Sequence, residues 1–173
     1  MRVATATEHA AVATDDAEVP VEDAMLPGDR PHGIRFGTLV HGVLAEVDLD
    51  ADRVAVATIA ALQGRLLGAT ADEVDAAVDA VVHALAHPLL RRAAAAPSCR
   101  REAPVLLRLD DGTLVEGVAD AAFADADGWT VIDFKTDREL GTRLADYRRQ
   151  VALYADAVAR ATGKPARAVL LRV

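Results

Sequence analysis

The sequence predicts an α/β domain with a mixed β-sheet flanked by helices, preceded by a helical segment. Apolar residues between 34 and 96 recur every three or four positions, which is the spacing of packed helices. Between 102 and 135 the pattern changes to short alternating segments broken by two turn signals, as in antiparallel strands. A helical pattern over 144–161 and an apolar segment over 168–173 follow. We therefore expect a three-strand meander, a helix and one further strand.

Four helices are predicted before the meander. The first covers residues 34–47 and the second covers residues 52–67. The third begins at Thr70, where Thr70 and Glu73 have the spacing of a capping box. Pro88 permits a short fourth helix, because proline is tolerated in the first turn.

The first thirty residues differ in composition from the rest. Residues 1–30 are rich in Ala, Thr, Asp and Glu and show little periodicity, so we expect a flexible acidic lead. The domain is expected over residues 31–173. It would consist of a helical part over 31–97 and a part that holds the catalytic sheet and helix over 98–173.

The composition limits the class of protein. Hydrophobic residues make up 52% of the chain and aromatic residues only 3%, so the core has to be mainly aliphatic. Cys99 is the single cysteine, which excludes an intramolecular disulfide and a cysteine-ligated iron–sulfur cluster. No stretch approaches about 18 uninterrupted apolar residues, and no apolar segment follows Met1. We expect a soluble, cytoplasmic protein with no membrane partner.

The charge is unevenly distributed along the chain. A net charge of −8 argues weakly against nucleic acid, because phosphates bind Lys and Arg. Residues 1–50 carry a net −7, whereas residues 135–173 carry a net +5. The C-terminal third therefore predicts an electropositive surface, with an ordinary solvated helix face as the alternative.

Two carboxylates interrupt apolar strands. Asp120 and Asp133 lie in segments that are otherwise Val, Ala, Ile and Phe, and a hairpin at 125–128 would bring their strands together. Converging carboxylates in such surroundings are costly unless a divalent cation lies between them. The alternative is that Asp133 and Lys135 form a surface pair on an edge strand, which the apolar flanks disfavour.

These residues resemble a known signature, that of the RecB-family nucleases in the PD-(D/E)xK superfamily. The landmarks in chain order are His41, Glu102, Gly117 with Asp120, Asp133-Phe134-Lys135-Thr136, and Gln150 with Tyr154. The resemblance covers about residues 33–173. It implies a restriction-endonuclease-like sheet.

The resemblance also implies a metal-dependent deoxyribonuclease. The implied metal ligands are His41, Asp120, Asp133 and the carbonyl of Phe134. The ion would be Mg²⁺, with Mn²⁺ tolerated because imidazole is an uncommon Mg²⁺ ligand. Besides the two aspartates, the implied catalytic residues are Lys135, Gln150, Tyr154 and Glu102. Lys135 would hold the attacking water or help to deprotonate it, and would offset charge in the transition state.

Other charged side chains have competing interpretations. In the family interpretation the arginines of the 144–161 helix and its approach face DNA phosphates, and some of them are simply solvated: Arg143, Arg148, Arg149 and Arg160. His83 and His87 have the i, i+4 spacing of a metal pair. No acidic partner lies obviously near them, so we favour a helix-end role.

Among the family's members, the sequence most resembles the C-terminal nuclease domain of AddA-like, UvrD-family helicase–nucleases. Such a domain acts as a DNA exonuclease in double-strand-break processing and recombinational repair. The chain has no ATP-binding loop, so a UvrD-like helicase would belong to the same longer chain or to a partner subunit. The alternatives are a catalytically inactive nuclease fold that binds or tethers DNA, and a standalone hydrolase of another phosphodiester.

Overall fold

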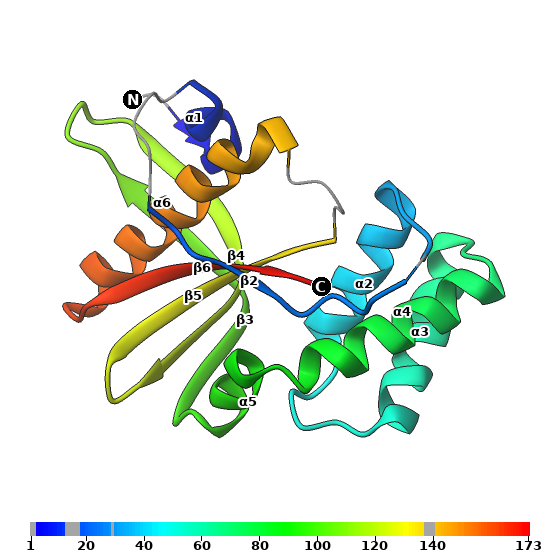
Figure 1. Cartoon of the computed structure of the whole chain (residues 1–173). Coiled ribbons are helices and arrows are strands. Elements are labelled where there is room, and N and C mark those ends of the chain that lie inside the picture. The colour runs from blue at the N-terminus through cyan, green and yellow to red at the C-terminus, as the bar shows by residue number, and fades with distance from the viewer. Residues whose placement is uncertain (1–2, 13–17, 29, 137–140) are drawn as a thin grey trace. The chain divides into compact units, whose positions relative to one another are not determined.

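The computed structural model describes residues 3–12, 18–28, 30–136 and 141–173 (Figure 1). The chain divides into two compact units. Unit 1 comprises Met1–Glu22, Ala96–Asp133 and Leu140–Leu170, and unit 2 comprises Asp23–Ala95, Phe134–Glu139 and Leu171–Val173.

A mixed sheet has the strand order β1-β4-β5-β6-β2, with β3 paired to β4 (Figure 1). The strands are β1 (Val3–Thr5), β2 (Val21–Asp23), β3 (Ser98–Arg108), β4 (Leu114–Asp125), β5 (Gly128–Lys135) and β6 (Ala166–Arg172). Strands β3, β4 and β5 form an antiparallel meander, whereas β1 is parallel to β4. Helix α6 (Leu144–Thr162) lies between β5 and β6 in the chain. The predicted fold class is confirmed.

Strand β4 has different partners along its two edges. β3 pairs with it over its whole length, from Arg108 opposite Leu114 to Ser98 opposite Ala124. On the other edge β1 pairs with residues 114–116 and β5 with residues 121–125. Residues 117–120, which carry the Gly-x-x-Asp signature, therefore lie between these two partners.

The core of unit 1 is mainly aliphatic, as the composition predicts. Helix α6 buries Tyr147, Val151 and Tyr154 in the same cluster as Ala119 and Leu170. The two tyrosines are the aromatic side chains that are fully part of this cluster. Small and branched side chains fill the rest, so α6 can approach β4 closely.

Unit 2 contains the predicted helices. They are α2 (Ile34–Glu46), α3 (Arg53–Leu67), α4 (Ala71–Leu85) and α5 (Pro88–Ala95). The expected stripe of α2 is buried, with Leu39, Val40, Val43 and Leu44 at 0% exposure. The predicted capping box of α4 is also confirmed: Thr70 accepts from the Glu73 amide, and Glu73 accepts from the Thr70 amide.

The first thirty residues contain more regular structure than the sequence predicts. Besides β1 and β2, they form helix α1 (Ala6–Val12), whose first turn is closed by reciprocal hydrogen bonds between Thr5 and Glu8. Ala6 and Ala10 are each 1% exposed. The segment packs through alanines, and its strands are three residues long, so it has no apolar periodicity to detect. None of the described helices is both long enough and apolar enough to span a bilayer.

Candidate active site

Unit 1 places three carboxylate residues on neighbouring strands. Arg101 pairs with Ala121 and Ala103 with Ala119, so the register places Glu102 opposite Asp120. On the other edge the pairing ends at Ala121 opposite Ile132, one residue after Asp120 on β4 and one residue before Asp133 on β5. Opposite residues of an antiparallel pair point to the same face, with Cα atoms about 4.5–5.5 Å apart. Asp120 and Asp133 thus directly adjoin the last pair of residues on these two neighbouring strands.

Asp133 is the most deeply buried of these three carboxylate residues. It is 5% exposed and stands between Ile132, at 0%, and Phe134, at 3%. Strand β5 lies between β4 and β6, so it is not an edge strand. The alternative of a surface pair between Asp133 and Lys135 is therefore wrong. A carboxylate in such a position is costly to bury without a compensating charge or hydrogen bond.

Glu102 differs from the two aspartates. It is exposed, and its φ of 46° lies in the left-handed region, which is strained for a residue with a side chain. Among the described residues, no three His, Cys, Asp or Glu side chains gather into a group that could hold a metal ion. The strand pairing places the carboxylates on neighbouring strands, but it does not by itself assemble a complete ligand set.

The Gly117, Gln150 and Tyr154 landmarks meet in unit 1. Gln150 Nε2 donates a hydrogen bond to the Tyr154 hydroxyl at 2.9 Å, as their i, i+4 spacing on α6 allows. A Cβ atom on Gly117 would lie 2.5 Å from Tyr154 Cε1 and 2.7 Å from its hydroxyl oxygen. Glycine is therefore required at 117 because the tyrosine ring packs directly on the β4 backbone.

The structure also shows a contact of Gln150 that sequence reasoning missed. Its Nε2 donates to Thr7 Oγ1, also at 2.9 Å. Thr7 lies in the segment predicted to be an unstructured lead, and no motif marks it. Only the fold reveals this contact, because the two residues are 143 positions apart.

The arginines of α6 have internal partners. Arg148 Nε donates to the Val19 carbonyl at 2.9 Å, and Arg149 Nε donates to the Ala10 carbonyl at 2.8 Å. Both side chains thus bind backbone of the N-terminal segment, a contact that the sequence did not predict. Arg143 packs over the Tyr147 ring, with its guanidinium carbon 4.9 Å from the ring centroid.

In unit 2 helix α2 carries His41 close to the end of β5. The His41 ring meets the Phe134 ring edge-on, with centroids 6.2 Å apart. One turn earlier, a Cβ atom on Gly37 would lie 2.8 Å from Thr136 Oγ1. The rings of His41 and Phe134 are thus in contact, whereas the ligand predicted at Phe134 is its backbone carbonyl. Lys135 follows directly, and strand alternation places its side chain on the same face of β5 as that of Asp133.

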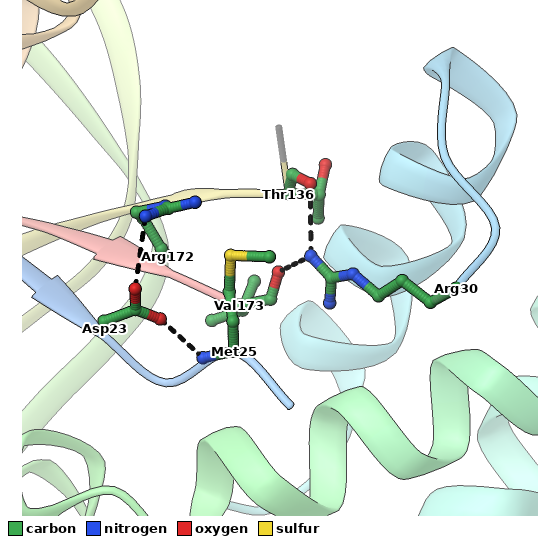
Figure 2. Close-up of polar contacts among 6 residues, drawn as sticks. All are labelled: Asp23, Met25, Arg30, Thr136, Arg172 and Val173. Carbon is green, nitrogen blue, oxygen red and sulfur yellow. Dashed lines mark hydrogen bonds and ion pairs between the residues drawn. The ribbon is translucent and has the colours of Figure 1, made fainter. Parts of the chain in front are cut away.

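Arg30 fixes the backbone that follows Lys135. Figure 2 shows its guanidinium donating to the Thr136 carbonyl at 3.2 Å and to the Val173 carbonyl at 2.6 Å. The guanidinium also packs over the Phe36 ring, 5.6 Å from its centroid. The Val173 amide in turn donates to the Lys135 carbonyl at 2.9 Å. Sequence reasoning missed Arg30, because its polar partners are carbonyls that no side-chain pattern reveals.

Two further contacts hold the β2–β6 end of unit 2. Asp23 pairs with Arg172 at 3.2 Å and accepts a hydrogen bond from the Met25 amide at 2.9 Å (Figure 2).

His87 accepts a hydrogen bond from the Leu89 amide at 3.3 Å, at the start of α5. That contact is the helix-end role expected for His87.

Comparisons with known proteins identify the family to which this site belongs. Residues 19–173 match the family model of the PD-(D/E)XK nuclease superfamily. The chain is 35% identical over 146 residues to an ATP-dependent helicase/nuclease subunit of Desulforudis audaxviator (strain MP104C), covering 71% of this chain and 12% of that protein. It is 30% identical over 160 residues to the protein of the same name from Bacillus cereus (strain G9842), covering 75% of this chain and 13% of that protein. The chain thus spans about an eighth of the length of these curated relatives.

Proposed function

The chain belongs to the PD-(D/E)XK nuclease superfamily, and from that premise we propose that it is a metal-dependent deoxyribonuclease that hydrolyses phosphodiester bonds. The observation that carries the proposal is the buried carboxylate of Asp133, on the strand next to that of Asp120 and followed on its own strand by Lys135. This order of residues matches the family signature. Because the surroundings of Asp133 are apolar, a bound cation would offset the cost of burying its carboxylate.

The donor chemistry of the predicted ligands fits a hard divalent ion. Asp120, Asp133 and the Phe134 carbonyl offer oxygen, which Mg²⁺ and Mn²⁺ prefer, and His41 adds one nitrogen that favours tolerance of Mn²⁺. When bound, the ion would lower the pKa of a water molecule and polarise the phosphate.

The remaining residues have roles that follow from their own chemistry. Lys135 would hold the attacking water and stabilise negative charge that develops on the phosphate. Gln150 orients Tyr154, and Gly117 lets the tyrosine ring approach β4. Glu102 would act at the edge of the site, where its exposed carboxylate can bind water.

The biological setting that we propose is a helicase–nuclease. The names of both relatives join a helicase with a nuclease, and this chain corresponds to about an eighth of their length. A UvrD-like motor, in a longer chain or in a partner protein, would supply DNA strands to the site. The activity would then be exonucleolytic, in the cytoplasm, during double-strand-break processing and recombinational repair.

The test is cleavage of end-labelled single- and double-stranded DNA with Mg²⁺, with Mn²⁺ and with EDTA. Asp133→Asn should reduce the cleavage rate by about 100- to 1,000-fold, the usual cost of losing one essential electrostatic group. Asp110→Asn, at the exposed β3–β4 turn, is the matched control and should cleave like the wild type. Cleavage that survives EDTA or Asp133→Asn would contradict the proposal. DNA binding without cleavage by the wild type would identify the inactive tethering module instead.

A further inference from the structure

The contact between Thr7 and Gln150 joins the predicted site to a segment outside the family match, which begins at residue 19. We propose that Thr7 is a positioning residue for Gln150 and Tyr154, and that residues 3–12 are a working part of the nuclease unit. This inference rests on the proposed function, because Gln150 and Tyr154 are assigned there to the site.

The hydrogen-bond capacity of Gln150 carries the argument. A glutamine amide has two N–H hydrogens. One is directed to Thr7 Oγ1 and the other to the Tyr154 hydroxyl, both at 2.9 Å. With both hydrogens engaged, Gln150 has none to donate to a DNA phosphate. Its role in this arrangement is to orient Tyr154.

Thr7 is itself held firmly in place. Strand β1 pairs in parallel with β4, from Val3 opposite Leu114 to Thr5 opposite Glu116. Helix α1 then buries Ala6 and Ala10, and the Ala10 carbonyl accepts a hydrogen bond from Arg149. Arg149 directly precedes Gln150 on α6, so two consecutive α6 side chains bind the same short helix.

The pairing of β1 ends beside the motif. The last paired residue on β4 is Glu116, and the next is Gly117, on which the Tyr154 ring packs. A hollow of about 480 Å³ in unit 1 is lined by residues that include Thr7, Gly117 and Tyr154. Thr7 and the tyrosine that it orients through Gln150 therefore face one cavity.

This geometry has a chemical consequence for Tyr154. Because its oxygen accepts from Gln150, the hydroxyl's own hydrogen takes no part in that bond. Without the Thr7 oxygen, the amide would lose one of its two acceptors and could rotate about its last side-chain bond. The orientation of the tyrosine hydroxyl would then no longer be fixed.

The experiment compares Thr7→Val with Thr7→Ser in the full chain, in the DNA cleavage assay. Valine keeps the shape of threonine but removes the acceptor, so kcat should fall by about 3- to 10-fold, the effect of one hydrogen bond, while KM changes less than about twofold. Serine keeps the hydroxyl and should restore kcat. Unchanged or increased cleavage by Thr7→Val would overturn the inference, as would equal impairment by Thr7→Ser.

A stability measurement separates this inference from the proposed function. Urea unfolding of Thr7→Val, Gln150→Ala and the double variant should show coupling between the two positions, because they share a hydrogen bond. Absence of coupling would overturn the inference even if the nuclease is active. If the wild type is inactive with both metals, the proposed function fails and the positioning role fails with it. An active wild type with an unaffected Thr7→Val variant overturns only the positioning role.

Discussion

In unit 1 the carboxylates lie on three neighbouring strands that pair through their backbones, whereas in unit 2 the end of β5 is held by side chains. Asp120 and Asp133 directly adjoin the last backbone pair of β4 and β5, Ala121 with Ile132. Thr136 instead depends on one guanidinium, and His41 rests against one aromatic ring. We therefore expect single side-chain changes in unit 2 to lower the free energy of unfolding. In unit 1 we expect such a loss only where an added atom forces strands and helix apart.

The largest effect should come from Arg30→Met. The substitution removes charged hydrogen bonds to the Thr136 and Val173 carbonyls while keeping apolar bulk near Phe36. Hydrogen bonds to charged groups contribute about 1.5–3 kcal/mol each, so loss of both should lower the free energy of unfolding by about 3–6 kcal/mol. Urea denaturation measures this change directly.

Arg35→Met is the matched control for Arg30. Its side chain is 52% exposed and its guanidinium pairs with Glu73, a surface contact worth about 0–1 kcal/mol. If Arg30→Met and Arg35→Met lower the free energy of unfolding equally, the Arg30 contacts do not hold the end of β5 as we propose.

Two glycine-to-alanine variants, one in each unit, test this difference at positions where a glycine lies close to another residue's side chain. Gly117→Ala places a Cβ atom 2.5 Å from the Tyr154 ring, and a ring packed in the core cannot move aside cheaply. The free energy of unfolding should fall by about 1–3 kcal/mol, the usual cost of overpacking. Gly37→Ala meets only the Thr136 hydroxyl, at 2.8 Å, which can rotate away.

The gain in helix propensity at Gly37, about 1 kcal/mol, should offset that contact and leave stability nearly unchanged. Thermal or urea unfolding of the two variants provides the comparison. Equal destabilisation would mean that the α2–β5 contact of unit 2 is as rigid as the sheet of unit 1.

Much of the fold could be predicted, because periodic segments carry their own evidence. The stripe of α2, the capping box at Thr70 and the turns that bound β4 depend on neighbours in the sequence. Strand β1 and helix α1 were missed because three-residue strands have no period. Their burial depends on alanines, which are common everywhere in this chain.

The candidate site was predictable to the extent that its residues lie in fixed-spacing motifs. Asp133 and Lys135, two positions apart, and Gln150 and Tyr154, four apart, could be assigned to shared faces. Thr7 and Arg30 could not, since each binds a residue more than one hundred positions away. Long-range polar contacts of this kind leave no local pattern.

The smallest effect concerns the helix starts, where both units use the same Thr-x-x-Glu arrangement, at Thr5 and Glu8 in unit 1 and at Thr70 and Glu73 in unit 2. The hydrogen bond from the Thr70 backbone, followed by that from Arg35, lowers the pKa of Glu73 below its ordinary value of 4.5. A lowered pKa in the folded state means that the stabilisation is complete above pH 4.5. It disappears as the pH falls through the lowered value.

Glu73→Gln should therefore flatten the acid side of the stability profile while a neutral cap remains, because glutamine also serves in a capping box. The measurement is the urea midpoint of the wild type and the variant between pH 7 and pH 3. Asp75→Asn, on the exposed face of the same helix, removes one charge without touching Thr70 or Arg35 and should keep the wild-type slope. If Asp75→Asn flattens the profile as much, net charge rather than the Glu73 contacts determines the acid stability of this helix.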